Sequence, residues 1–284
     1  MASDRFRPVV FGLRAMLVAA AALALIAGYQ VFVLSEHTDR DFAWTIANPL
    51  TAAFMGAGYW ASLPMLLYGA RQTIWANFRA SFFSPLVFSS AMLIASLRHL
   101  GVFHFSEPNA PMAIVTAWLW MAAYVIVPIC EVILLWLQLR RAGIDPPRAA
   151  GMPQGLRAVL AVQGLIAGAF GLLLFFAPAA AAPHWPWKLT PLTAQIVGGW
   201  LLATAVAAGV TVYEIDWRRV AGPIASYTVL GILELVALAR FPSALMWPGV
   251  AAVAYLVFLI SMVLVGALAW ILALRARVRH RTAA

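Results

Sequence analysis

The chain has 284 residues, of which 64% are hydrophobic and only 10% are charged. Its mean hydropathy of +0.90 is higher than a water-soluble domain of this length can hide in its core. The net charge of +9 comes without the basic runs, interleaved with polar or aromatic residues, that a nucleic-acid groove needs. These features exclude a soluble fold and a nucleic-acid partner, and they indicate an all-α integral membrane protein in a lipid bilayer.

A helix that crosses a bilayer needs about 20 mostly apolar residues. A scan with that length predicts eight transmembrane helices, each bounded by charged residues, Pro or Gly. In chain order the predicted spans are 14–34, 49–70, 82–100, 110–139, 156–178, 191–213, 222–241 and 248–274. The fourth span is long enough to be tilted, or kinked at Pro128.

The loops between the predicted spans alternate in their content of Lys and Arg. One side holds Arg5, Arg7, Arg71, Arg79, Arg140, Arg141, Arg148, Arg218, Arg219, Arg275, Arg277, Arg279 and Arg281. The opposite loops hold two cations, Arg40 and Lys188, among the acids Glu36, Asp39, Asp41 and Glu107. The positive-inside rule therefore predicts that both termini are cytoplasmic. A composition rich in Ala and in Arg over Lys suggests a bacterial gene, which makes the expected location a bacterial plasma membrane.

The chain aligns with itself over most of one half, which predicts a duplication. At an offset of 143 residues, Gly12-Leu13-Arg14-Ala15 matches Gly155-Leu156-Arg157-Ala158, and Gly28, Phe32 and Trp44 match Gly171, Phe175 and Trp187. At an offset of 142, Pro49-Leu50-Thr51-Ala52 matches Pro191-Leu192-Thr193-Ala194, and Gly56, Trp75, Ser84 and Arg98 match Gly198, Trp217, Ser226 and Arg240. The sequence thus predicts a parallel repeat of a four-helix unit, with a first repeat at 1–139, a cytoplasmic linker at 140–155 and a second repeat at 156–284.

The matched residues have structural interpretations. Pro begins a helix where a missing N–H costs nothing, and Gly permits close approach of two helices. Trp44 and Trp187 at the outer interface, with Trp75 and Trp217 at the inner one, are typical of an aromatic belt. Arg98 and Arg240 end the third and seventh spans on the outer side. We expect them to reach lipid headgroups, with a pair of cations at an outer mouth as the functional alternative.

Two acids lack a counterpart in the other half. Glu131 lies nine residues before Arg140 and Glu234 twelve residues after Gly222, which places them about 13 Å and 18 Å from the cytoplasmic ends of their helices. An acid at such a depth costs on the order of 2.5 to 3.5 kcal/mol, so each should face the bundle interior, have a partner or be protonated. Both are candidates for a ligand or proton site. The structural alternative is a neutral acid that hydrogen-bonds a neighbouring helix.

Other chemistry has little support in the sequence. The outer-side histidines could bind a divalent metal, but their spacings match no ligand motif; they are His37, His99, His104 and His184. The chain has no phosphate-binding loop, nucleophile elbow, zinc-protease helix, paired-cysteine motif or dinucleotide motif. We therefore predict no cofactor, no metal and no catalytic residue.

The second half contains Pro191 to Ala194 at a helix start, then Gly198-Gly199, then Asp216 to Arg219 in an acidic and basic loop. In these features it resembles bacterial multi-span membrane proteins of uncharacterised activity. The resemblance implies a membrane fold and no particular reaction.

Three functions remain open. The first is a carrier or binder of a small apolar or amphipathic molecule at the interface of the two repeats, with Glu131 or Glu234 contacting its polar group or a proton. The second is a membrane subunit or assembly scaffold for a partner protein, favoured by the scarcity of polar residues in the spans. The third is an intramembrane enzyme acting on lipid, which would need converging polar residues that the sequence does not indicate.

Overall fold

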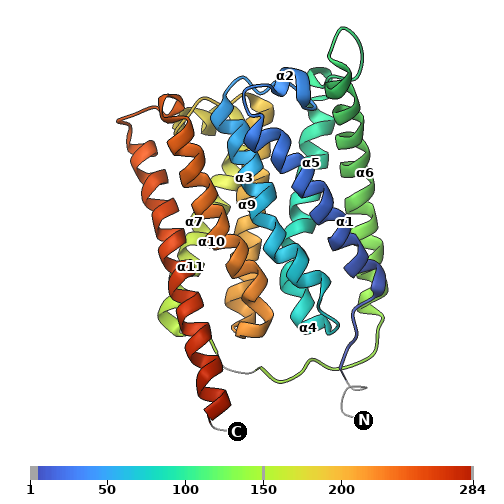
Figure 1. The fold of residues 1–284 in the computed structure, drawn as a ribbon, viewed down its shortest axis with the longest axis vertical. Helices are drawn as coiled ribbons and strands as arrows, with labels where there is room; N and C mark the ends of the chain where they lie inside the picture. Colours follow the sequence, from blue (N-terminus) through green and yellow to red (C-terminus); the bar gives the residue numbers. More distant parts are fainter. Residues whose placement is uncertain (1–5, 149–150, 283–284) are drawn as a thin grey trace.

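The computed structural model describes residues 6–148 and 151–282, without the side chains of residues 276–282. Eight helical segments in these ranges are long and apolar enough to cross a membrane, which confirms an all-helical, multi-pass membrane protein (Figure 1). They are Phe11–Val33, Pro49–Ala70, Trp75–Arg98, Pro111–Leu139, Gln154–Phe176, Pro191–Glu214, Trp217–Arg240 and Val250–Arg275. Among the arginines used to predict the orientation, Arg5 and the side chains of Arg277, Arg279 and Arg281 lie outside the described residues.

The elements that make up these segments are α1 (Phe11–Gly28) with η2 (Tyr29–Val33), α3 (Pro49–Ala70), α4 (Trp75–Phe78) with η3 (Arg79–Ser81) and α5 (Phe83–Arg98), α6 (Pro111–Leu139), α7 (Gln154–Phe176), α9 (Pro191–Glu214), α10 (Trp217–Arg240) and α11 (Val250–Thr282). Short helices lie between them: α2 (Thr38–Asp41), η4 (Leu100–Val102), α8 (Pro178–Ala181), η5 (Ala182–His184) and η6 (Pro242–Ala244). The segment Tyr29–Val33 is a single π-helical turn.

Local chemistry explains where several helices begin. Asn48 caps α3 by accepting a hydrogen bond from the Leu50 N–H, and α9 begins with a capping box between Thr190 and Thr193. Asp216 caps α10 in the same way, through the Arg218 N–H at 2.8 Å. This last cap starts α10 at Trp217, earlier than the predicted 222, because the following arginines belong to the first helical turn and not to a loop.

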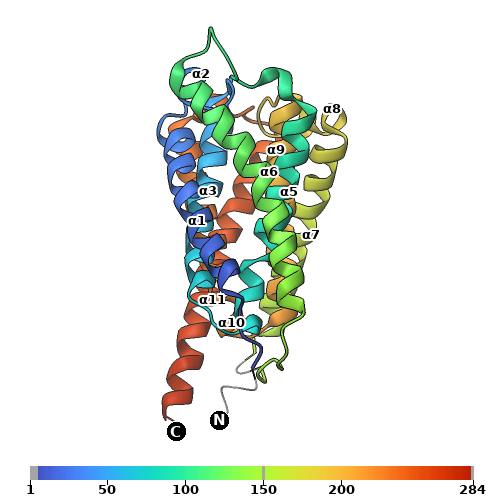
Figure 2. The same cartoon turned by 90° about the vertical axis from the view of Figure 1, so that its right-hand side faces the viewer.

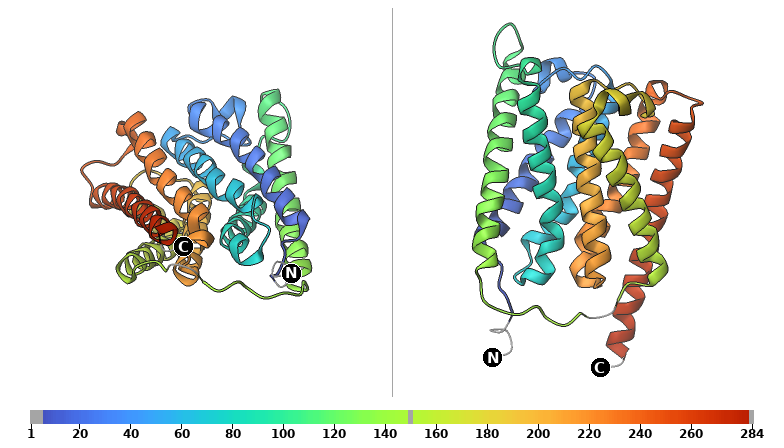
Figure 3. Two further views of the ribbon diagram at one scale, coloured as in Figure 1. Left: turned by 60° about the horizontal axis from the view of Figure 1, so that its bottom comes forward. Right: turned by 180° about the vertical axis from the view of Figure 1, so that it is seen from behind.

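Four central helices, α3, α5, α9 and α10, form the middle of the bundle. Among these four helices the closest packing joins α3 to α10 and α5 to α9, so each pair joins a helix of the first half to one of the second. Each outer helix packs mainly on one central helix: α1 on α3, α7 on α9, α6 on α5 and α11 on α10. The difference in burial is large, since 72% of an apolar 18-residue window of the α3 span is buried and only 17% of the corresponding window of the α6 span. Figure 3 shows α6 and α11 at opposite flanks of the bundle, and Figure 2, viewed from the α6 side, has α6 in front of α11.

Glycine permits the tightest helix contacts. A Cβ on Gly56 of α3 would lie closer than 3.0 Å to the backbone of Phe32, and a Cβ on Gly198 of α9 would lie as close to the backbone of Phe175. These two contacts join α1 to α3 and α7 to α9. They involve residues that the sequence alignment of the two halves matches, so the halves use the same packing contact at equivalent places.

The two ends of the bundle differ in charge. The N-terminal end of α1, the C-terminal end of α11 and the connection between α6 and α7 lie at the same end (Figures 1 and 3). We call it the basic end; it includes Arg71, Arg79, Arg140, Arg141 and Arg218. The short helices α2 and α8 lie at the opposite end.

The predicted aromatic belt is wrong for the four matched tryptophans. A belt residue presents its ring to headgroups, whereas Trp44, Trp75, Trp187 and Trp217 are between 0% and 7% exposed. They lie near the ends of the spans but pack inward. Trp187 even donates a hydrogen bond from Nε1 to Thr51 Oγ1 at 2.8 Å, which ties the outer loop before α9 to α3.

Candidate functional site

A cavity with a volume of about 360 Å³ lies inside the bundle. Its walls come from α1, α3, α5 and α6 of the first half and from α9 and α10 of the second. The volume lies within the range of sites that bind one small molecule. Most lining side chains are apolar, so the cavity suits a ligand that is largely hydrocarbon.

The exposed part of the cavity wall lies on α1 and α6. Its most exposed lining side chains are Leu23 and Ile26 on α1 and Met112, Val115 and Leu119 on α6, each between 46% and 62% exposed. All five are apolar and belong to membrane-spanning helices.

Glu131 supplies the carboxylate of the cavity wall. It projects from α6, is 2% exposed, and its Oε2 accepts a hydrogen bond from Ser89 Oγ on α5. Its second oxygen, Oε1, accepts no hydrogen bond within the described part of the chain. The expectation that this acid faces the bundle interior and has a partner is met, and one oxygen of the carboxyl group is left for a further contact.

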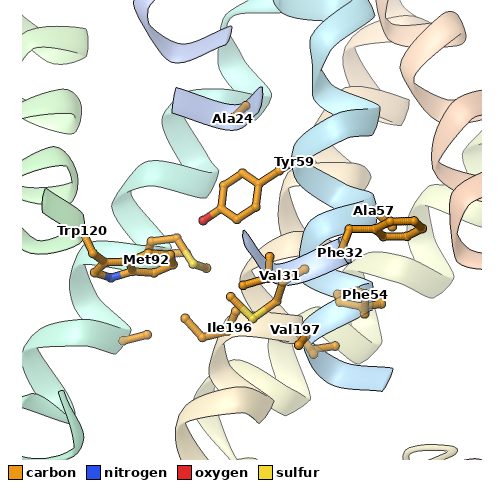
Figure 4. Packing of buried hydrophobic residues seen from close by; sticks show 14 of the residues in the cluster. Ala24, Val31, Phe32, Phe54, Ala57, Tyr59, Met92, Trp120, Ile196 and Val197 are labelled. Atoms are coloured by element: carbon orange, nitrogen blue, oxygen red, sulfur yellow. The ribbon is translucent and has the colours of Figure 1, made fainter. Parts of the chain in front are cut away.

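Two tyrosines that are hydrogen-bonded to each other line the same cavity. The hydroxyl of Tyr59 on α3 and that of Tyr124 on α6 are 2.6 Å apart. One of them donates to the other, which leaves one hydroxyl proton to donate elsewhere. Figure 4 shows the Tyr59 hydroxyl pointing toward the side of the bundle on which Trp120 lies. Tyr124 and Glu131 are two helical turns apart on α6, about 10 Å along the helix axis, so both face the cavity.

Glu234 occupies a different place. It projects from α10 and is 1% exposed, and its Oε2 accepts a hydrogen bond from Tyr255 Oη on α11 at 3.2 Å. Tyr255 packs against Trp185 and Trp187 of the outer loop. Glu234 does not line the cavity, so the structure does not bring the two candidate acids into one site. Its remaining oxygen is buried without a partner among the described residues.

The two outer arginines also lie outside the cavity. Arg240 donates hydrogen bonds to the carbonyl of Phe32 and to Ser35 Oγ, the second at 3.4 Å, and its guanidinium lies 5.2 Å from the Phe32 ring centroid. It therefore ties α10 to the C-terminal end of the first span, and because the residue is exposed, its contact with headgroups stays a prediction. Arg98 is exposed. The predicted pair of mouth cations is thus made of residues with different surroundings.

Two of the outer histidines are engaged in structural hydrogen bonds. His104 contacts Thr45 Oγ1 at 3.1 Å and the carbonyl of Phe42 at 3.0 Å. His99 Nε2 lies 3.0 Å from Gln195 Oε1. Each ring thus joins two segments at the outer end of the bundle.

The basic end contains an ion-pair network that the sequence did not predict. Glu214, at the end of α9, is completely buried and contacts both Arg79 and Arg219, the latter at 2.8 Å. Arg79 also contacts Asp145 in the connection between the halves at 2.5 Å. Arg219 donates a further hydrogen bond to the carbonyl of Pro146 at 2.5 Å. The network joins the start of the third span, the α9–α10 junction and the linker.

The arginines of this network were counted only as evidence for orientation. The available signal was the pair of acids, Glu214 and Asp216, directly before Arg218 and Arg219, because unpaired cations facing headgroups need no acids beside them. This pattern still does not identify Arg79 as a partner, since it lies 135 residues away from Glu214 in the chain.

No protein-family model matches this chain, and no curated protein or solved structure matches it significantly.

Proposed function

We propose that this membrane protein binds a small amphipathic molecule in the cavity between its halves and carries it within or across the bilayer. The single observation that supports this most is the apolar cavity of about 360 Å³, whose exposed wall residues lie on the membrane-spanning helices α1 and α6 and whose wall includes the carboxyl group of Glu131. The apolar walls suit the hydrocarbon part of such a molecule, and the polar groups suit its head.

We further propose that the basic end faces the cytoplasm of a bacterial plasma membrane and that the two halves descend from one four-helix unit. The distribution of arginines supports the orientation. The matched Gly and Phe contacts at α1–α3 and α7–α9, and the equivalent pairings of α3 with α10 and α5 with α9, support the duplication. In this arrangement both halves contribute to the cavity.

The test compares two adjacent alanines on α6. Ala123 lines the cavity, whereas its neighbour Ala122 is exposed and does not. Ala123→Trp should fill the cavity, while Ala122→Trp adds the same ring on the lipid side. Each protein is released from its own membrane in mild detergent and analysed by native mass spectrometry.

We expect the wild type and Ala122→Trp to retain a small molecule that Ala123→Trp loses. Equal retention by both variants would place the ligand elsewhere and contradict the proposal. A stoichiometric protein partner in all three samples, with no small molecule in any, would instead favour the alternative of an assembly scaffold.

A further inference from the structure

The cavity contains an acid and no base. Among its described lining residues none is Lys, Arg or His, and Glu131 is the only carboxylic acid. A buried carboxylate without a cation is costly in an apolar environment, and a positively charged ligand removes that cost. A negatively charged head group, such as a carboxylate or a phosphate, would meet repulsion from Glu131 and no compensating cation.

Four aromatic rings line the same cavity as this acid. Phe88, which precedes Ser89 on α5, has its ring centroid 4.0 Å from that of Trp200 and 5.9 Å from that of Tyr124. Tyr59 lies 5.2 Å from Trp200, so the four rings from α3, α5, α6 and α9 form one cluster. All four residues line the cavity. We call them the aromatic cluster.

Rings and a carboxylate together recognise cations. The face of an aromatic ring attracts an ammonium group placed within about 6 Å of its centroid, and such clusters are a known means of binding organic ammonium ions. The free Oε1 of Glu131, on a side chain only 2% exposed, adds a charged hydrogen-bond acceptor to the cluster. Neither feature offers an equivalent advantage to a neutral alcohol.

From this charge balance and geometry we propose that the ligand is a lipophilic organic cation: an ammonium group at Glu131 and the aromatic cluster, on an apolar chain. The chain extends along α1 and α6 toward Gln30 and Met112 at the outer end of the cavity. The inference rests on the proposed function and names the chemical class of the molecule that the cavity binds.

Three probes with one chain length test the class of head group: n-dodecylamine, n-dodecanol and n-dodecanoate. An equimolar mixture is added to the purified full-length protein in nanodiscs of zwitterionic lipid, and the bound species are quantified by native mass spectrometry. Wild type, Glu131→Gln and Glu234→Gln are compared. The last variant is the matched control, because Glu234 is an equally buried acid outside the cavity.

We expect the ratio of bound amine to bound alcohol to fall about tenfold in Glu131→Gln and to stay at the wild-type value in Glu234→Gln. Comparing ratios between variants cancels the different partitioning of the probes into the nanodisc. Preference of the wild type for dodecanoate would overturn the inference without reference to any variant. An unchanged ratio in Glu131→Gln would overturn it as well.

Failure of this inference differs from failure of the proposed function. If amine and alcohol bind equally and Ala123→Trp abolishes both, the cavity binds amphiphiles but does not select cations. If Ala123→Trp and Ala122→Trp bind all three probes as the wild type does, the cavity is not the binding site and both proposals are wrong.

Discussion

The buried ion-pair network at the basic end gives a sharp prediction about stability. Glu214 is completely buried and contacts two guanidinium groups, those of Arg79 and Arg219. Asp145 contacts Arg79 as well, but its side chain is 34% exposed. Glu214→Gln and Asp145→Asn each remove one negative charge with almost no change of shape, so they compare the same chemistry at two levels of burial.

The expected magnitudes differ several-fold. Breaking a buried ion pair by removing one partner costs about 3–5 kcal/mol, because the remaining charges stay buried without compensation. An exposed pair contributes about 0–1 kcal/mol, because water solvates the partner that remains. With about 2–4 °C of shift per kcal/mol in a chain of this size, Glu214→Gln should lower the Tm by on the order of 10 °C, and Asp145→Asn by no more than about 4 °C.

The assay is thermal unfolding of the two variants and the wild type in one detergent, followed by tryptophan fluorescence and by the loss of the monodisperse peak in size-exclusion chromatography. High salt provides a second readout. It should reduce the effect of Asp145→Asn and leave that of Glu214→Gln nearly unchanged, because buried pairs are screened least. Equal Tm shifts for both variants would refute the argument from burial.

Two further predictions concern packing and orientation. Gly56→Ala should destabilise the bundle by about 1–3 kcal/mol in the same assay, because the new methyl group meets the backbone of η2. The control Gly209→Ala meets no atom within 4 Å and should be neutral. Equal Tm values for the two variants would contradict the close helix contact. The orientation is tested in a Cys130→Ser background, which removes the single cysteine. A membrane-impermeant maleimide added to intact cells should label Glu107→Cys, and it should label Arg141→Cys only after the cells are permeabilised. The reverse labelling pattern would contradict the proposed orientation.

The sequence predicted the spans well because each depends on local composition. The predicted span 49–70 agrees with Pro49–Ala70, and 110–139 agrees with Pro111–Leu139 to within one residue. The larger errors in the predicted limits of the spans lie where charged residues form part of a helix. The third span begins at Trp75 and not at 82, because Arg79, read as part of a loop, is paired with acids inside the fold.

The site was predicted only in part, for a physical reason. The free-energy cost of placing an acid inside the membrane identifies Glu131 as a residue that needs a partner in any fold. Its partner Ser89 lies on another helix, 42 residues away, and the paired Tyr59 lies 65 residues from Tyr124. Hydropathy and charge do not encode which faces of two apolar helices meet, so neither the aromatic cluster nor the separation of Glu131 from Glu234 could be predicted.

The proposed repeat also explains why the cavity lies beside α6 and not beside α11, its counterpart. The offset of 142 residues that matches Trp75 with Trp217 pairs Ser89 with Gly231. Extended into the last helix of each half, where the similarity of the two sequences fades, the same offset pairs Tyr124 with Gly266 and Glu131 with Ala273. At both glycines α10 and α11 approach so closely that a Cβ would press against the facing side chains.

The same positions in the first half hold a hydroxyl and a phenol, with Glu131 corresponding to Ala273. These larger polar side chains cannot pack as closely as glycine and alanine do, so α6 stands off from its neighbours and leaves space that α11 fills. In the proposed duplication, the cavity thus arises by exchanging small packing residues for polar ones in one copy. The intact packing of the other copy keeps the bundle together.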